Sequence, residues 1–144
     1  MAAFVYEYPR PMVTVDCVLA YQNSNAIYVL LIQRGREPFK GMWALPGGFV
    51  DLNEDLPHAA KRELLEETGI VCDQLMQFAA YGSPGRDPRG HTISVVFYSI
   101  VHSQINPNAG DDAVYAKWFN ISELPEIAFD HKIILSDFII AHFH

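Results

Sequence analysis

The sequence has few cysteines and lacks long hydrophobic runs. Cys17 and Cys72 are its two cysteines, and each stands among apolar residues, so we expect buried free thiols rather than a disulfide or a metal site. No apolar run approaches the roughly 20 residues that span a bilayer, and the N-terminus has no charged-then-apolar signal pattern. We therefore predict no membrane association and a cytoplasmic location.

Positive charge is also scarce. Lys and Arg number 10 against 17 Asp and Glu, which gives a formal net charge of −7. Because nucleic-acid-binding proteins usually carry a basic stripe, we expect no nucleic-acid partner. The glycine motifs of Rossmann and P-loop nucleotide sites are absent as well. A small phosphorylated ligand remains compatible with this charge if a metal ion or a few arginines neutralise its site.

Length and composition indicate one domain with a sheet and two helices. The 144 residues include no internal repeat, low-complexity tract or long linker, so we predict a single domain over residues 1–144. Alternating or continuous apolar runs predict the strands, and the run over 92–102 is apolar on both faces for part of its length. We expect strands at 13–21, 27–32, 43–49, 75–81, 92–102 and 114–120, the third of them running into a glycine turn.

Capping residues mark the two predicted helices. Asp55 precedes a helix over residues 56–68, and Gly69 is suited to end it. Asp130 is a candidate cap for a final helix, whose core-facing side would hold Ile133, Ile134, Phe138 and Ile140. Two helices covering the faces of a sheet make an α/β sandwich.

The helix predicted over residues 56–68 carries a concentration of acids. Glu63, Glu66 and Glu67 are three and four residues apart, a spacing that places them on one helix face. Like charges at this spacing destabilise a helix unless a cation lies between them. Carboxylate oxygens are ligands that Mg²⁺ prefers, and Mg²⁺ often bridges to substrate phosphates. We therefore expect this helix to bind a divalent cation.

These acids belong to a longer pattern. Gly48 is followed after five residues by Glu54 and, after seven more, by Arg62-Glu63-Leu64-x-Glu66-Glu67-x-Gly69-Ile70. This stretch resembles the box of the Nudix hydrolases at every defining position. A solvated acidic helix, the alternative interpretation, would not explain the glycine, Glu54 and Arg62 at their spacings. The resemblance implies an α/β/α sandwich with a mixed central sheet, in which the box forms a strand–loop–helix.

The resemblance implies a metal-dependent hydrolase. Nudix proteins cleave a nucleoside diphosphate linked to another moiety, by attack of water on a phosphorus of the diphosphate with Mg²⁺ or Mn²⁺. A box retained only for binding is the open alternative. The implied metal ligands are Glu63 and Glu67, with Glu66 and the carbonyl of Gly47 or Gly48 as further ones.

Other residues would support the chemistry. The resemblance implies that Arg62 holds Glu63 by a charge-assisted hydrogen bond, while Glu54 braces the loop or joins the outer shell of the metal. The catalytic base stays open between Glu63 and a loop acid outside the box, Asp111 or Asp112. A capped turn is an equally good interpretation of those two aspartates.

Three segments resemble Nudix enzymes that act on ADP-ribose and their regulatory relatives: residues 8–11, 82–91 and 128–131. Arg86 and Arg89 would engage a diphosphate or a ribose phosphate, because the guanidinium fork matches oxyanion geometry. The alternative is that Arg86 pairs with Asp87 and shapes the loop. The loops around Arg34, Arg86 and Phe129 would select the substrate, although Phe129 is equally well placed in a core.

The leading hypothesis is therefore Mg²⁺-dependent hydrolysis of ADP-ribose to AMP and ribose 5-phosphate. The alternatives are another substrate, such as a nucleotide sugar or a damaged nucleoside triphosphate, and a non-catalytic domain that senses ADP-ribose. Sensing relatives continue into a DNA-binding winged helix, so an acidic chain ending at His144 argues against a repressor. The proline-rich, aromatic segment 4–11 would cover a core edge, add an edge strand or exchange with a second copy in a homodimer.

Overall fold

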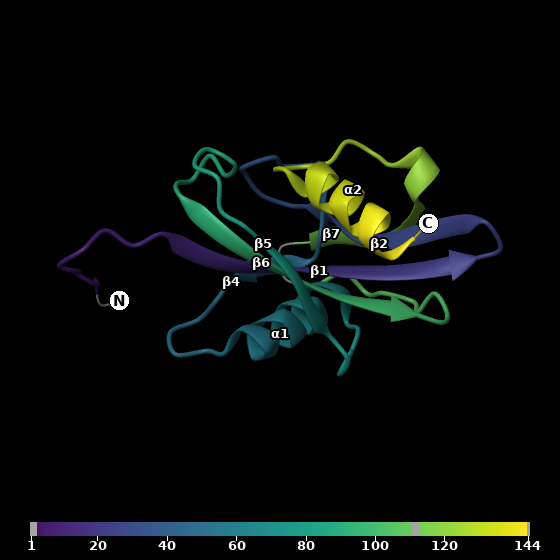
Figure 1. The fold of residues 1–144 in the computed structure, drawn as a ribbon, viewed down its shortest axis with the longest axis horizontal. Helices are drawn as coiled ribbons and strands as arrows, with labels where there is room; N and C mark the ends of the chain where they lie inside the picture. Colours follow the sequence, from purple (N-terminus) through teal and green to yellow (C-terminus); the bar gives the residue numbers. More distant parts are fainter. Residues whose placement is uncertain (1–2, 111–112, 144) are drawn as a thin grey trace.

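A mixed seven-stranded sheet forms the centre of the molecule, with α1 on one face and α2 on the other (Figure 1). This computed structural model describes residues 3–110 and 113–143. The helices are α1 (Leu56–Thr68) and α2 (His131–His142), and a 3₁₀ turn covers Ile121–Glu123. The strands are β1 (Met12–Asn23), β2 (Ala26–Arg34), β3 (Trp43–Ala44), β4 (Gly47–Phe49), β5 (Met76–Tyr81), β6 (Thr92–Val101) and β7 (Ala113–Asn120).

The long strands β1 and β6 lie parallel at the centre of the sheet. Their register runs from Met12 opposite Thr92 to Tyr21 opposite Val101. The other strand pairs among the described residues are antiparallel, and an isolated parallel bridge joins Trp43 to Ile127. β6 buries Val95 and Phe97 against the α1 side and Val96 against the α2 side. The prediction of a strand that is apolar on both faces is therefore confirmed, as is the mixed α/β sandwich.

Both ends of α1 lie where the capping residues predicted. The Asp55 side chain accepts a hydrogen bond from the backbone N–H of Leu56, and Gly69 ends the helix in a left-handed conformation with φ 71°. Leu64 is fully buried in the core under the sheet. Cys17 is buried beside the helix as a free thiol, whereas Cys72 is free but only half-buried.

The core-facing side of α2 differs in part from the prediction. Ile134 and Phe138 are buried as expected, whereas Ile133 is 59% exposed and Ile140 is 69% exposed. Burial follows positions one and four apart from Ile134, which leaves the other two isoleucines on the solvent side. Asp130 is the residue before the helix, but its carboxylate caps no backbone N–H.

The predicted strand over residues 43–49 is wrong in detail. Two short strands, β3 and β4, flank Leu45 and Pro46, and the glycines lie in β4 rather than in a turn. Proline has no N–H for a sheet hydrogen bond, so the strand is interrupted there. β4 then pairs with β1 over Thr14 to Asp16.

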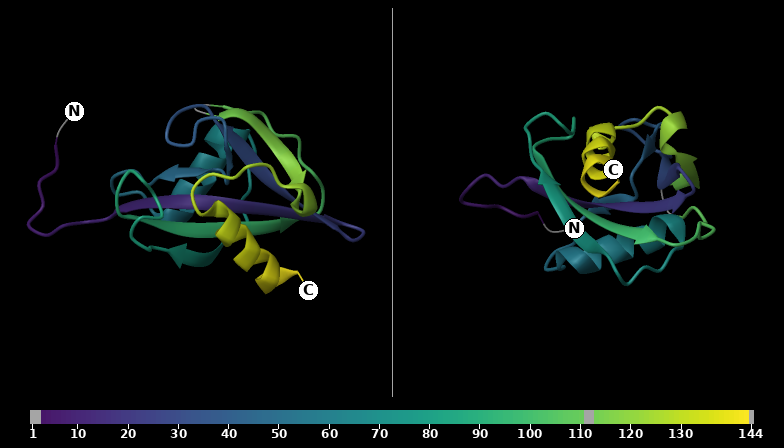
Figure 2. Two further views of the ribbon diagram at one scale, coloured as in Figure 1. Left: turned by 90° about the horizontal axis from the view of Figure 1, so that it is seen from above. Right: turned by 45° about the vertical axis from the view of Figure 1, so that its right-hand side comes forward.

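The N-terminal segment extends away from the sheet (Figure 2). Its residues 3–11 are exposed, including Phe4, Tyr6 and Tyr8. Neither a core edge nor a sheet edge of its own chain is covered by this segment, so those two expectations are wrong. Exchange with a second copy stays a prediction. Among the residues that the structure describes, no helix is long and apolar enough to span a membrane.

Candidate active site

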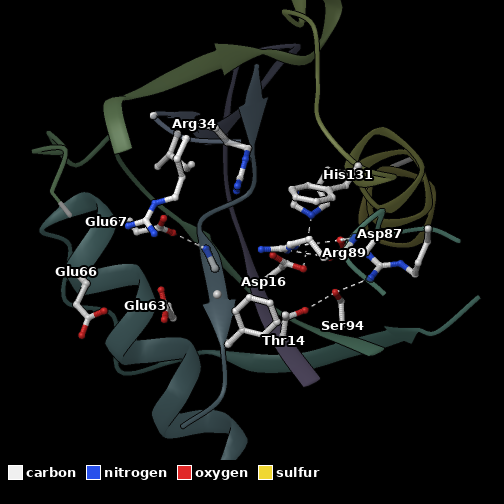
Figure 3. Close-up of a pocket in the computed structure, with 18 of the residues that line it drawn as sticks. Thr14, Asp16, Arg34, Glu63, Glu66, Glu67, Asp87, Arg89, Ser94 and His131 are labelled. Atoms are coloured by element: carbon white, nitrogen blue, oxygen red, sulfur yellow. Dashed lines mark hydrogen bonds and ion pairs between the residues drawn. The ribbon is translucent and has the colours of Figure 1, made fainter. Parts of the chain in front are cut away.

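A cavity of about 590 Å³ opens beside β4, at the part of β1 that pairs with β4 and not with β2. Its walls come from the sheet, from α1, from the loop before β6 and from the start of α2 (Figure 3). The volume lies within the usual range for small-molecule sites, roughly 300–1,000 Å³. The sequence-predicted site residues that line it are Arg34, Gly47, Gly48, Glu63, Glu66, Glu67, Arg86, Arg89 and Phe129.

The three glutamates of α1 form one wall of this cavity. Glu67 is 9% exposed, and its Oε1 accepts a hydrogen bond of 2.7 Å from the backbone N–H of Gly47. Burial, together with the charges of Glu63 and Asp16, raises the pKa of Glu67 to about 8, although the hydrogen bond from Gly47 acts in the opposite direction. Burial likewise raises the pKa of Glu63. The surroundings of Glu63 and Glu67 therefore oppose the ionisation of both carboxyl groups, and a bound cation would favour it.

The two glycines of β4 allow the strand to lie directly against these acids. A Cβ atom on Gly48 would stand 2.6 Å from the carboxyl carbon of Glu63. A Cβ on Gly47 would stand 2.1 Å from the carbonyl oxygen of Val15 and 2.4 Å from Asp16 Oδ1. Only glycine fits at either position without a shift of its neighbours.

Arg62 holds the acids of the box in place. Its Nε and Nη2 donate to the two carboxylate oxygens of Glu54 at 2.7 and 2.8 Å. Its Nη1 donates to Glu63 at 2.9 Å and to Glu66 at 3.1 Å, and Nη2 also donates to the carbonyl of Phe49. The Arg62 hydrogen bonds lower the pKa of Glu54 to about 2. Glu54 thus braces the arginine that orients two acids of the cavity wall.

The donor types of this wall fit a hard divalent cation. Within residues 3–110 and 113–143, no three Asp, Glu, His or Cys side chains are arranged as a preformed metal cage. Mg²⁺ does not require one, because it usually binds through one or two carboxylates, several waters and substrate phosphates. Asp111 and Asp112, the other candidates for a base, lie outside the described residues.

Arg86 has a different partner from the one considered from sequence. Its Nε and Nη2 donate to both carboxylate oxygens of Asp130 at 2.8 and 2.6 Å, and Nη1 donates to Ser94 Oγ at 2.8 Å. The alternative that Arg86 pairs with Asp87 is therefore wrong, since Asp87 is held by Arg89. The side chain of Arg86 is only 6% exposed, so it acts chiefly to join the loop before β6 to the start of α2.

Arg34 and Arg89 meet at the ring of Phe129. The guanidinium of Arg34 lies 5.0 Å from the ring centroid and that of Arg89 lies 5.3 Å from it. Arg89 also lies 4.7 Å from the ring of Phe49. Phe129 lines the cavity and also packs edge-on against Phe39, so both interpretations of Phe129 apply. This end of the cavity combines positive charge with aromatic faces.

No role was assigned from sequence to several polar residues of the cavity, among them Thr14, Asp16 and Ser94. His131 also lines the cavity and ends the segment 128–131 singled out from sequence, but it was given no role of its own. Asp16 and His131 are 5% and 4% exposed. Burial raises the pKa of Asp16 and lowers that of His131, against the attraction between the two groups. The signal available in the sequence was a polar residue inside an otherwise apolar strand, as for Asp16 and Ser94.

Comparison with known proteins places these features in context. Residues 10–138 match the model of the NUDIX domain. An ADP-ribose pyrophosphatase of Methanocaldococcus jannaschii is 43% identical over 132 residues, which cover 91% of this chain and 75% of that protein. An ADPR responsive transcriptional repressor of Acinetobacter baylyi is 37% identical over 133 residues, covering 90% of this chain and 53% of the repressor. The NUDIX domain of Shewanella oneidensis NrtR, solved with ADP ribose, superposes with a TM-score of 0.86 at 29% identity, covering 93% of this chain and 90% of that one.

Proposed function

Because this chain belongs to the Nudix hydrolase family, we propose that it hydrolyses the diphosphate bond of ADP-ribose to give AMP and ribose 5-phosphate. The observation that carries the proposal is a single cavity with carboxylates on one wall and arginines on another. A similar pyrophosphatase and a similar domain solved with ADP ribose support the choice of substrate.

The acidic wall is the proposed catalytic part. Glu63, Glu66, Glu67 and the carbonyl of Gly47 would hold Mg²⁺ or Mn²⁺, which would neutralise charge on the phosphoryl oxygens and lower the pKa of a bound water. Arg62 keeps two of these carboxylates turned toward the cavity, and Glu54 keeps Arg62 in place. Glu63 is the proposed base among the described residues, and Asp112 stays a proposal on sequence alone.

The basic wall is the proposed substrate-binding part. Arg34 and Arg89 would neutralise the diphosphate, and Phe129 would offer its face to the base of the nucleotide. Arg86 would contribute indirectly, because its donors are largely committed to Asp130 and Ser94.

A nucleotide panel tests this function. Purified protein with Mg²⁺ or Mn²⁺ should convert ADP-ribose to AMP and ribose 5-phosphate with the highest kcat/KM of the panel. The other members are nucleotide sugars and damaged nucleoside triphosphates. Absence of AMP from ADP-ribose, together with turnover of another member, would overturn the substrate.

The similarity to a transcriptional repressor supports a second candidate, a domain that senses ADP-ribose. In that case calorimetry would detect ADP-ribose binding in the presence of Mg²⁺, while no AMP would form over the same period. Release of AMP excludes this candidate as the sole function.

A further inference from the structure

The C-terminal end of α1 carries charges of the unfavourable sign. Its last turn is Leu65-Glu66-Glu67-Thr68, so both charged side chains there are negative. The carbonyl groups at a helix C-terminus form the negative end of the helix dipole, and an acid beside them costs stability. The last carbonyls also lack partners within the helix itself. A turn that presents two proposed metal ligands therefore depends on donors from outside the helix.

Such donors come from the loop between β6 and β7. The backbone N–H of Asn108 donates to the carbonyl of Thr68 at 2.7 Å, and that of Gly110 donates to the carbonyl of Glu67 at 3.2 Å. We call residues 108–110 the capping segment. Two carbonyls at the end of α1 are thus held by a segment that is distant in sequence.

Gly110 makes this contact because it has no side chain. A Cβ atom there would stand 2.4 Å from the carbonyl oxygen of Glu66, which belongs to the helix backbone and cannot rotate away as a side chain can. Gly110 does not have a left-handed φ, so the close approach to α1 is what requires glycine.

The same loop is fixed at a second point, on β7. Trp118 Nε1 donates to the carbonyl of Ile105 at 2.9 Å. Trp118 packs against the core cluster that contains Leu64 of α1. Because this anchor does not involve the end of the helix, loss of the contacts between the capping segment and α1 leaves the loop attached to the sheet.

We propose that the capping segment positions Glu66 and Glu67 for the divalent cation, and that its contacts with α1 and cation binding stabilise each other. The inference rests on the proposed function in taking these two acids as metal ligands. While the segment holds the end of α1, the last turn stays helical and both carboxylates keep their place in the cavity wall. A bound cation removes the repulsion among the acids that loosens the same turn, and such coupling is reciprocal.

Binding of Mn²⁺ without nucleotide measures this role. Electron paramagnetic resonance during titration with Mn²⁺ gives the affinity of the native chain and of Gly110→Ala. The added methyl group should force the segment off the helix and weaken Mn²⁺ binding about tenfold, the usual effect of losing one or two neutral hydrogen bonds. Gly82→Ala is the matched control, because a Cβ atom there would meet the side chain of Ile93 at an ordinary 3.5 Å. Its affinity should equal that of the native chain.

A pair of substitutions at Asn108 separates the backbone donor from the side chain. Asn108→Pro removes the N–H that donates to Thr68, whereas Asn108→Ala keeps it. The proline variant should bind Mn²⁺ several-fold more weakly, and the alanine variant should bind it as the native chain does. Thermal melting shows which variants are folded, so this pair serves if Gly110→Ala does not fold.

Amide hydrogen exchange of the native chain, followed by NMR, tests the reverse direction without any substitution. Mg²⁺ should slow the exchange of Asn108 and Gly110 several-fold, because these amides exchange when the segment leaves the helix. The amide of Ser122, which donates to Asn120 Oδ1 in the 3₁₀ turn, is the internal control and should be unaffected.

Several outcomes overturn the positioning role. These are Mn²⁺ affinity of a folded Gly110→Ala within about twofold of the native value, equal affinity of the two Asn108 variants, exchange of both amides that ignores Mg²⁺, and failure of the native chain to bind Mn²⁺. If Mn²⁺ binding depends on Gly110 but no AMP forms from ADP-ribose, the positioning role stands and the proposed hydrolysis falls.

Discussion

At the residue scale, the guanidinium of Arg62 ties together three carboxylates and one backbone carbonyl. Its five N–H groups are all directed at these acceptors, a geometry that a lysine ammonium cannot reproduce. The charge of the box is therefore organised by one residue that itself need not touch the substrate. Glu54, whose pKa is held near 2, is the anchor of this arrangement.

Replacement of Arg62 by Lys tests the anchor. Arg62→Lys should lower kcat by roughly tenfold or more with a smaller change in KM. The reason is that Glu63 and Glu66 lose their orientation, whereas the contacts of the substrate are retained. Steady-state kinetics with ADP-ribose measure both constants, and Lys61→Arg at the exposed neighbouring position is the control. An unchanged kcat would show that Arg62 has no positioning role.

Glu67 gives a pH dependence that can be worked out in sign. Its pKa is raised from 4.5 to about 8 in the folded protein, so the folded state holds a proton that the unfolded state releases. This contribution to stability is complete below about pH 4.5 and is lost as pH rises through about 8. Metal-free protein should therefore lose melting temperature across this window, and Mg²⁺ should restore more of it at about pH 9 than at about pH 6.

The matched variant for this prediction is Glu67→Gln. The melting temperature of this variant should lack the part of the decrease with rising pH that Glu67 contributes, and Mg²⁺ should raise it less than in the native chain. The variant should also lose most turnover, because an uncharged amide replaces a proposed ligand. Near-normal activity of Glu67→Gln would remove the metal role of this residue.

At the element scale, β4 lies so close to α1 and β1 that its two glycines have different functions. The obstacle to a side chain at Gly48 is the flexible carboxyl end of Glu63, whereas the obstacle at Gly47 is the backbone of β1. A mobile side chain can move aside, but a paired central strand cannot move without loss of its hydrogen bonds.

Two alanine variants test this difference. Gly48→Ala should displace Glu63 and lower kcat at least tenfold with a small change in melting temperature. Gly47→Ala should destabilise the fold by about 1–3 kcal/mol, a loss of roughly 2–4 °C per kcal/mol for a chain of this size. Thermal melting and kinetics of both variants check the prediction, and equal destabilisation would contradict it.

At the scale of the whole molecule, the arm over residues 3–11 exposes aromatic side chains that the rest of the chain does not cover. Phe4, Tyr6 and Tyr8 are 62%, 47% and 71% exposed. Phe4 and Tyr6 stack on each other, and Arg10 lies 3.8 Å from the Tyr6 ring centroid, which covers little of this apolar surface. Aromatic surface exposed in this way favours association.

We expect the native chain to form a homodimer through this arm. Light scattering at micromolar concentration should give twice the monomer mass, and combined replacement of Phe4, Tyr6 and Tyr8 by Ser should give the monomer. The same replacement leaves the described cavity untouched, so kcat/KM of a dissociated variant shows whether the site needs a second copy. A monomeric native chain would end the proposal.

The sequence by itself determined what depends on local spacing. Helix α1, its two caps and the acidic face of the box follow from residues at most a few turns apart, and a helix converts such spacing directly into a shared face. The family also followed from this stretch. The strands could be found because burial on a sheet face requires apolar residues at regular intervals, although their ends shifted and β4 was merged with β3.

Only the tertiary structure decided which distant residues meet. Asp16 and His131 come together because α2 packs on the face of the sheet where β1 presents Asp16, and no local pattern of either segment encodes the other. The alternative partner considered for Arg86 was wrong for the same reason: Asp87 is its neighbour in sequence, while Asp130 becomes its neighbour only in the folded chain. Ion pairs and hydrogen bonds act over a few ångströms, so the fold must bring their groups together before the residues can select one another.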